Sequence, residues 1–320
     1  MGDEVIGLQK TSLFPEEILQ LLPGDVSRSV LSCRDRELDL ITEIRLRIGR
    51  KVHLVGPSLF LPVTVEPNHL RFVLATLTKS SLYAVDAELK NGFVTLSGGH
   101  RVGIAGKVVL GQDGGVQTIR DISSVNIRLA KEVRGSAKTL ATILNKRNRI
   151  GSAILFGPPA SGKTTLLRDL ARMLGSGESP FASPMRVVLI DERSEIAGTV
   201  SGVPQFDVGL ATDVLDGCPK QVGMTMALRS LSPEVIIADE LGGPQDALAV
   251  ADLAKAGVTL VGTAHAGAIS ELVRRSGMHH LSQESPITWW VEVSAQPVPG
   301  TIIRVYDSEL HEVKSWRGSL

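Results

Sequence analysis

One segment constrains the fold of this chain more than any other. It matches the phosphate-binding pattern G-x-x-x-x-G-K-[ST], and the residues expected to surround phosphate are Gly157, Pro158, Pro159, Ala160, Ser161, Gly162, Lys163, Thr164 and Thr165. An apolar run precedes the pattern and a helix-forming run comes after it, which is the setting that such a loop requires. Glycine lets backbone N–H groups surround phosphate oxygens, and the N-terminus of the helix favours negative charge. The segment predicts a P-loop; a chance turn rich in small residues is the alternative.

Two side chains of this segment have expected roles with ATP and Mg²⁺. The ammonium group of Lys163 is expected to neutralise the β- and γ-phosphates, which makes it a candidate catalytic residue as well as a binding one. The hydroxyl group of Thr164 is expected to ligate Mg²⁺. The segment therefore predicts ATP as the nucleotide and Mg²⁺ as the cofactor.

A second acidic cluster follows the apolar run 235–238, which ends in Asp239 and Glu240. A strand delivers such residues to the carboxyl edge of a parallel sheet, where ligands of open α/β sheets bind. Asp239 suits the outer shell of Mg²⁺, and Glu240 is the first choice for the group that polarises the attacking water. Two solvated carboxylates at a strand end are the alternative.

The apolar run 187–190 ends in another acidic segment, Asp191-Glu192-Arg193. If this strand belongs to the same sheet, the carboxylate of Glu192 faces the γ-phosphate from a neighbouring strand end. Glu192 is therefore expected to share or replace the base role of Glu240. Solvation, or pairing with Arg193, is the alternative.

A fourth strand end, after residues 258–262, carries Thr263-Ala264-His265. An imidazole beside the γ-phosphate reports its presence by making or losing one hydrogen bond. His265 is thus a candidate sensor that couples chemistry to motion. A structural histidine is the alternative.

The periodicity of apolar residues predicts two domains. Residues 1–135 are predicted to form an α+β domain, with helices at 12–22 and 69–90 and strands at 43–48, 52–55, 93–96, 102–110 and 125–129. Residues 136–320 are predicted to form an α/β domain, because buried strands alternate with helices as in a parallel sheet covered on both faces. Its predicted strands are 152–156, 187–190, 235–238, 260–262 and 302–306, and its predicted helices are 136–147, 164–174, 221–231, 244–256 and 269–275.

Composition narrows the class of protein and its surroundings. Lysine plus arginine equal aspartate plus glutamate at 34 each, so the chain lacks the basic excess of a dedicated nucleic-acid binder. Only Cys33 and Cys218 are present, which excludes a disulfide framework and a four-cysteine zinc site and favours a reducing, cytoplasmic setting. No run reaches the roughly 18 apolar residues of a spanning helix, so membrane association is expected through a partner or a surface patch.

The order of these motifs resembles the type II/type IV secretion ATPase superfamily. The P-loop is followed by the acidic segment 190–195, by Asp239-Glu240 and by the segment 263–265. Three further segments resemble those of the stage III sporulation protein AA family more narrowly, namely GGHRVG at 98–103, ISSVNIR at 122–128 and DVLDGCPK at 213–220.

The resemblance implies a RecA-like core, a homohexameric ring with ATP between protomers, and N-terminal domains that move against the core. It also implies membrane-embedded partners at a channel joining mother cell and forespore, with the ATPase on the cytoplasmic face. Family arginines that reach the nucleotide correspond most closely to Arg101 and Arg128, with Arg120 next. Solvated strand residues are the alternative at each position, although guanidinium groups suit phosphate charge.

The chain also departs from the superfamily. Secretion ATPases commonly have an Arg-Asp pair after their second acidic motif, whereas Leu241-Gly242-Gly243 stands here, and Asp191-Glu192-Arg193 replaces the usual Glu-Asp-Pro. The identity of the catalytic base is left open between Glu240 and Glu192. Three functions remain: a mechanochemical ATPase at a secretion-like channel, a nucleic-acid-stimulated RecA-like motor, and a nucleotide-gated assembly platform with little hydrolysis.

Overall fold

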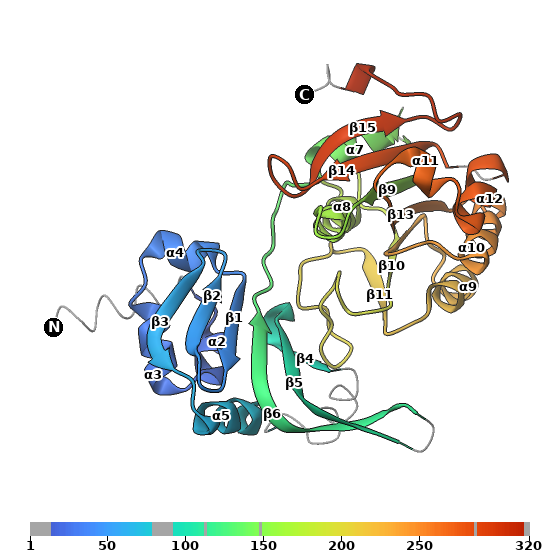
Figure 1. The fold of residues 1–320 in the computed structure, drawn as a ribbon. Coiled ribbons are helices and arrows are strands. Elements are labelled where there is room, and N and C mark those ends of the chain that lie inside the picture. Colours follow the sequence, from blue (N-terminus) through green and yellow to red (C-terminus); the bar gives the residue numbers. More distant parts are fainter. Residues whose placement is uncertain (1–13, 79–91, 112–113, 147–148, 285–286, 317–320) are drawn as a thin grey trace. The chain divides into compact units, whose positions relative to one another are not determined.

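The structure, a computed structural model, describes residues 14–78, 92–111, 114–146, 149–284 and 287–316 (Figure 1). The chain divides into two compact units, residues 1–131 and 132–320. The boundary predicted after residue 135 lies just beyond this division. Each unit has its own apolar core and is described by itself.

The N-terminal unit is an antiparallel sheet accompanied by helices. Its six strands lie in the order β3-β2-β1-β6-β5-β4, with bounds β1 Glu43–Arg47, β2 Lys51–Val55, β3 Leu59–Thr64, β4 Phe93–Thr95, β5 Arg101–Leu110 and β6 Val116–Arg128. Its helices are α2 Glu16–Leu21, α3 Gly24–Leu31, α4 Asp35–Leu40 and α5 Pro67–Thr78. Alternate residues of β1 are buried, as in Ile44 and Leu46, so one face of the strand builds the core.

The predicted hairpin at 43–48 and 52–55 is present as β1 and β2. Strand β3 was not predicted, because Pro62 interrupts its pattern; it occupies a sheet edge, where proline is tolerated. Strand β6 begins nine residues before the predicted start at Val125, since its polar first half gives no apolar alternation. The helix predicted at 69–90 is present as α5, and its second part, 79–90, lies outside the described residues.

The C-terminal unit is built on a sheet of seven strands in the order β11-β10-β12-β13-β9-β14-β15. Six of them run parallel, and β15 is antiparallel to β14. The strands are β9 Ala153–Gly157, β10 Val187–Asp191, β11 Thr212–Asp216, β12 Val235–Ala238, β13 Thr259–His265, β14 Trp289–Ser294 and β15 Thr301–Tyr306, and the short strands β7 Asn145–Lys146 and β8 Arg149–Ile150 form a separate pair.

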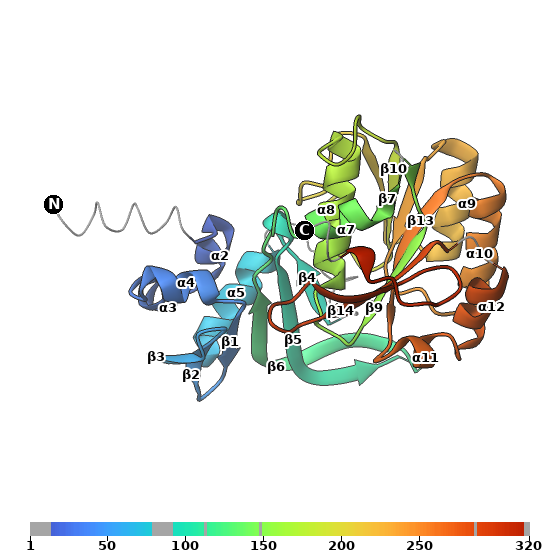
Figure 2. The same ribbon diagram turned by 90° about the horizontal axis from the view of Figure 1, so that it is seen from above.

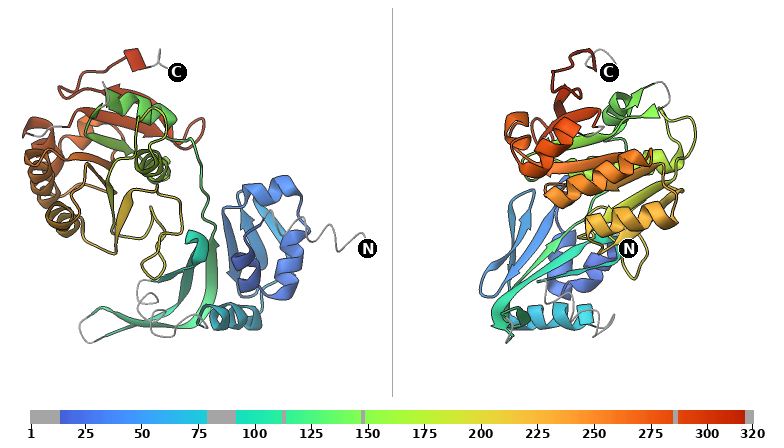
Figure 3. Two further views of the ribbon diagram at one scale, coloured as in Figure 1. Left: turned by 180° about the vertical axis from the view of Figure 1, so that it is seen from behind. Right: turned by 90° about the vertical axis from the view of Figure 1, so that its right-hand side faces the viewer.

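Helices cover both faces of this sheet (Figures 2 and 3). They are α7 Lys138–Leu144, α8 Lys163–Ser176, α9 Lys220–Ser230, α10 Pro244–Lys255, α11 Ile269–Leu272 and α12 Ser276–Glu284. Successive residues of each central strand enter different cores: Leu155 packs with α7 and α8, whereas Ile154 and Phe156 pack with α9, α10 and α12. Strands buried on both faces have continuous apolar runs, which is why the sequence indicated a parallel sheet.

The elements that the sequence analysis missed lie mostly at the edges of this sheet. Strand β11, TDVLD, alternates polar and apolar residues at one edge. Strand β14 lies toward the other edge, between β9 and β15, and helix α12 follows the short α11 closely in the chain. The helix predicted at 269–275 ends at Leu272. Within the described residues, no helix has both the length and the apolar character that crossing a bilayer requires.

Candidate nucleotide-binding site

Four parallel strand ends meet at one edge of the C-terminal sheet. Strands β10, β12, β13 and β9 are consecutive neighbours, so the segments that come after them lie side by side. These segments are the acidic segment after β10, Asp239 and Glu240 after β12, His265 at the end of β13 and the P-loop after β9. The order of the strands thus brings together motifs that are scattered along the sequence.

The backbone of the P-loop is fixed by glycine and by a second segment of the chain. Gly162 has φ of 91°, a left-handed conformation that glycine adopts without strain, and it directly precedes helix α8. A Cβ atom on Gly162 would lie 2.4 Å from the nitrogen of Gly300. Gly300 N–H donates to the carbonyl of Ser161 at 2.7 Å. The turn between β14 and β15, to which the sequence analysis gave no role, therefore supports the loop.

Lys163 lies inside the P-loop and is 5% exposed. Its Nζ donates to the carbonyls of Gly157 at 3.0 Å and Pro158 at 2.9 Å and to the Ser161 hydroxyl at 3.3 Å. Burial lowers the pKa of the lysine, and the nearby carboxylates of Asp239 and Glu240 act in the opposite direction. These carboxylates favour the charged ammonium group that phosphate binding requires.

Thr164 and Asp239 are in contact. The Thr164 hydroxyl donates to Asp239 Oδ2 at 2.9 Å. Asp239 Oδ1 accepts from the backbone of Glu240 at 3.0 Å and from the Thr263 hydroxyl. A hydroxyl and a carboxylate are hard oxygen donors, and Mg²⁺ that keeps water and phosphate ligands needs only one or two protein groups. The pair fits that ion, although the described residues contain no cluster of three or more acidic, histidine or cysteine side chains suited to a metal.

Glu240 has a strained backbone and a doubly paired side chain. Its φ is 54°, which is uncommon for a residue with a long side chain and is found most often at functional sites. Its N–H donates to the Thr263 hydroxyl at 2.9 Å, which holds this conformation. Its carboxylate lies 3.0 Å from His265 Nε2 and 2.8 Å from an Arg193 guanidinium nitrogen.

His265 lies between the lysine and the glutamate. Its Nδ1 is 3.3 Å from Lys163 Nζ, and its Nε2 is the nitrogen that contacts Glu240. Three predicted residues therefore form one chain of polar contacts. A shift of the lysine toward a phosphate would change the contacts of the imidazole, and through it those of the glutamate.

These side chains line a cavity of about 420 Å³. This volume is typical of a small-molecule site. The residues that line it are Pro159, Ala160, Ser161, Gly162, Lys163, Thr164, Thr165, Glu195, Asp239, Glu240, His265 and Pro299. Gly157 and Pro158 contribute their carbonyls to Lys163 instead.

The two glutamates of the segment after β10 lie in different places. Glu192, the predicted second base, is ion-paired with Lys220 and lines a smaller neighbouring pocket, which Glu195, Asp239 and Glu240 also line. Glu195, to which the sequence analysis gave no role, lines the P-loop cavity. Its spacing from the strand end gave no signal, because its position depends on how Asp191 folds the loop: the Asp191 carboxylate accepts the N–H groups of residues 195–197 at 2.8–2.9 Å.

Arg101 and Arg128 belong to the N-terminal unit. They are directly opposite each other on β5 and β6. The Arg101 guanidinium lies 4.1 Å from the centre of the Phe93 ring, and Arg128 Nε lies 3.5 Å from a Glu43 carboxylate oxygen. Arg120 faces Lys107 on the same pair of strands. A nucleotide contact by these arginines stays a prediction.

Comparison with known proteins agrees with this architecture. A family model described as "Sporulation stage III, protein AA" matches residues 14–313. Stage III sporulation protein AA of Bacillus subtilis (strain 168) is 40% identical over 297 residues, which are 92% of this chain and 95% of that protein.

Two solved structures are similar in fold. The X-ray structure of the Legionella pneumophila ATPase DotB aligns with a TM-score of 0.61 at 16% identity, covering 93% of this chain and 83% of that one. The pilus retraction motor PilT with bound ADP aligns with a TM-score of 0.55 at 17% identity, covering 80% of this chain and 75% of that one. The predicted fold class, a RecA-like P-loop core with a mainly parallel sheet and a smaller N-terminal α+β domain, is confirmed.

Proposed function

The chain belongs to the sporulation stage III protein AA family, and from this premise we propose that it hydrolyses ATP to ADP and phosphate to drive a secretion-like channel, or its assembly, between mother cell and forespore. The main support is the convergence of Lys163, Thr164, Asp239 and Glu240 on one cavity of about 420 Å³. A phosphate-binding loop, a pair of oxygen donors for a metal ion and a carboxylate for water are the parts that phosphoryl transfer to water needs.

In the proposed complex, the backbone N–H groups of the P-loop and the Lys163 ammonium bind the β- and γ-phosphates. Thr164 and Asp239 hold Mg²⁺, which supplies positive charge to the phosphate oxygens when it is bound. The first turn of α8 adds the favourable field of a helix N-terminus. These groups compensate the charge that limits attack on a triphosphate.

The hydrolytic step uses one water molecule. Its oxygen forms a bond to the γ-phosphorus while the bond from that phosphorus to the β–γ bridging oxygen breaks, and ADP leaves. Glu240 orients the water and accepts its proton. Arg193 and His265, both in contact with the Glu240 carboxylate, aim it, and His265 responds to movement of Lys163. Glu195 is a third carboxylate in the cavity, beside Asp239 and Glu240, whereas Glu192 lines only the neighbouring pocket.

The proposal extends to assembly and place. The working form is a homohexamer with ATP between protomers, in which Arg101 and Arg128 contact the nucleotide. The N-terminal α+β domain, residues 1–135, moves against the ATPase domain, residues 136–320. The protein acts in the cytoplasm, at the cytoplasmic face of a channel. The membrane-embedded components of that channel are its partners.

The test is ATP turnover across a protein concentration series, with the mass of the assembly measured by light scattering. Turnover per protomer is expected to rise as the hexamer forms. Lys163→Ala is expected to lower turnover about 100-fold or more, because phosphate charge is no longer compensated. Glu240→Gln is expected to lower it about 100-fold while ATP stays bound, with Glu192→Gln as the matched control.

Three outcomes would contradict parts of the proposal. Near-normal turnover in Glu240→Gln with a large loss in Glu192→Gln or Glu195→Gln would move the base role. Strong stimulation by DNA or RNA would favour a nucleic-acid motor instead. Tight ATP binding by the wild type without turnover would favour a nucleotide-gated platform.

A further inference from the structure

Arg168 connects the P-loop helix to a loop that lines the nucleotide cavity. It lies on α8 four residues after Thr164, which is about one helical turn. Its Nε donates to the carbonyl of Ile196 at 2.6 Å, and a terminal nitrogen donates to the carbonyl of Glu195 at 2.7 Å. The guanidinium lies 3.9 Å from the centre of the Phe206 ring. Its position is therefore fixed by two hydrogen bonds and by stacking.

The same loop is held from its other side by Asp191, which is 1% exposed. The carboxylate accepts the three consecutive N–H groups of residues 195–197. Burial raises the pKa of Asp191 and lowers that of Arg168; the three N–H groups oppose the first shift, and the Asp191 charge opposes the second. A buried carboxylate and a half-buried guanidinium thus hold the N–H groups and the carbonyl groups of one short stretch of backbone.

This stretch presents Glu195 to the cavity. Ser194, just before it, has φ of 52°, an unusual conformation for a residue other than glycine. Such a conformation persists only where the surroundings enforce it. Because Arg168 belongs to α8, the helix that begins at the P-loop also sets the position of the loop carrying Glu195.

We propose that Arg168 is a positioning residue for ATP hydrolysis: it ties the loop that carries Glu195 to the P-loop helix and so keeps that carboxylate at the nucleotide cavity. The inference rests on the proposed ATPase function and adds a residue to it. Arg168 acts through the backbone of the loop and touches no part of the substrate. A misplacement of about 1 Å caused by a change outside the reacting groups costs up to about 100-fold in rate.

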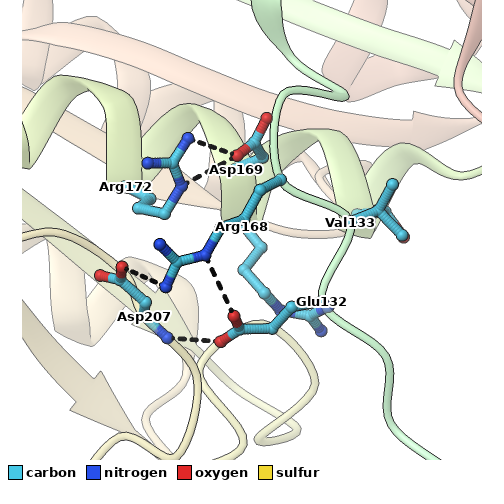
Figure 4. A pocket seen from close by; sticks show the side chains of 8 residues that line it. Glu132, Val133, Arg168, Asp169, Arg172 and Asp207 are labelled. Carbon is cyan, nitrogen blue, oxygen red and sulfur yellow. Dashed lines mark hydrogen bonds and ion pairs between the residues drawn. The ribbon is translucent and has the colours of Figure 1, made fainter. Parts of the chain in front are cut away.

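The geometry requires arginine in particular. A planar guanidinium reaches two successive carbonyls and stacks on a ring at the same time, whereas a lysine ammonium is a point charge that does neither as well. Arg168→Lys therefore keeps the charge and loses the fixed geometry. Figure 4 shows the face of α8 that carries Arg168, with Glu132 and the Asp169–Arg172 pair beside it.

Arg172 supplies the matched control. It lies one turn further along the same helix and is 5% exposed. It donates two hydrogen bonds to Asp169, at 3.0 and 2.8 Å, and is ion-paired with Glu178. None of these partners lines the nucleotide cavity. Arg172→Lys therefore disturbs a buried arginine of α8 without moving Glu195.

The experiment measures kcat, KM and the affinity for a non-hydrolysable ATP analogue in the full chain. Arg168→Lys is expected to lower kcat about tenfold and to leave the affinity within about twofold, whereas Arg172→Lys keeps kcat within about twofold. Phe206→Leu, which removes the ring under the guanidinium, is a milder second variant with the same kcat-only loss.

A double variant decides whether Arg168 acts through Glu195. In a Glu195→Gln background, Arg168→Lys is expected to cause no further loss of kcat, since residues that act as a unit are not additive. Three results would overturn the inference while the ATPase function stands. They are a double variant whose loss of kcat is the product of the two single losses, a loss of kcat in Arg172→Lys equal to that in Arg168→Lys, and an unchanged kcat in Arg168→Lys. Analogue binding by the wild type without turnover would overturn both.

Discussion

The two units of this protein differ in what they bury. Within the described residues, His100 is the one buried polar side chain of the N-terminal unit, whereas the C-terminal unit buries Ser161, Lys163, Asp169, Arg172, Asp191, Thr199, Asp246, Thr263 and Glu292. Buried charges cost free energy unless they are paired and hydrogen-bonded. The first unit is therefore stabilised mainly by apolar packing, whereas the second also maintains buried charges, among them Lys163 at the candidate site.

Removing the carboxylate of Asp191 is expected to have the largest effect. Asp191→Ala leaves three backbone N–H groups without their acceptor and removes one of the two anions that act on Arg168, which is expected to lower the free energy of unfolding of the C-terminal unit by about 3–5 kcal/mol. Urea unfolding followed by tryptophan fluorescence measures this unit alone, because all three tryptophans, at 289, 290 and 316, belong to it.

Asp216 is the control for that change. It is the register partner of Asp191 on β11, but it is exposed and accepts one hydrogen bond, from Ser194 at 2.6 Å. Asp216→Ala is expected to cost less than about 1 kcal/mol. An equal loss of unfolding free energy in Asp191→Ala and Asp216→Ala would show that the burial of Asp191 does not account for its effect.

Asp169 provides the second-largest expected effect. Its carboxylate accepts the N–H of Ala137 at 2.8 Å and pairs with Arg172, so it joins α8 to the start of the C-terminal unit. Asp169→Ala is expected to cost about 3 kcal/mol, because the arginine is left buried with one partner fewer. Adding Arg172→Met is expected to recover part of the loss in the same tryptophan measurement. A double variant less stable than Asp169→Ala would show that the arginine has adequate partners without Asp169.

The N-terminal unit offers a smaller test, through pH. His100 Nδ1 accepts the N–H of Ala130 at 3.0 Å, and its Nε2 lies 3.3 Å from Glu17. Burial lowers the pKa of His100 below the usual 6.5, and Glu17 acts in the opposite direction. The unfolded chain therefore binds the proton more readily, so stability is present above pH 6.5 and is lost as the pH falls below it.

One proton limits the slope to about 1.4 kcal/mol per pH unit. Hydrogen exchange of the amides at 44 and 46, corrected for intrinsic rates, measures this loss. The difference between wild type and His100→Gln isolates the residue from other histidines. The same slope in both proteins would show that His100 is not responsible.

The smallest effect is expected at an exposed pair of the C-terminal unit. Lys255 Nζ lies 3.0 Å from Asp252, with side chains 77% and 65% exposed. Asp252→Asn is expected to change the free energy of unfolding by less than about 0.5 kcal/mol, because water and salt screen such a pair. A loss as large as that of Asp169→Ala would mean that charge pairs matter here irrespective of burial.

The sequence predicted the central strands β9, β10, β12 and β13 and the edge strand β15 of the C-terminal unit, but it missed β11 and β14. Continuous apolar runs mark β9, β10 and β12, and the P-loop pattern identifies the loop and the helix after β9, because both signals are local. Strand β11 mixes polar and apolar residues, and β14 needed the tertiary context of β9 and β15. Local patterns identify an element, but its neighbours are decided by packing.

The same distinction applies to the site. Lys163 and Thr164 were predicted from the P-loop pattern, and Asp239 and His265 from strand ends; the structure places Lys163 next to His265 and Thr164 next to Asp239. Glu195 enters the cavity because Asp191 and Arg168 fold its loop, and neither set of backbone hydrogen bonds has a sequence signature.

The contact between Gly300 and the P-loop has a consequence for the order in which the protein is made. The nucleotide loop leaves the ribosome about 140 residues before the turn that supports it. During synthesis, the N-terminal unit can fold as soon as it emerges, since domains generally fold as units. The candidate nucleotide site is completed only after Gly300 has been made. A nascent chain lacking the β14–β15 turn therefore has a P-loop without the hydrogen bond from Gly300 to Ser161.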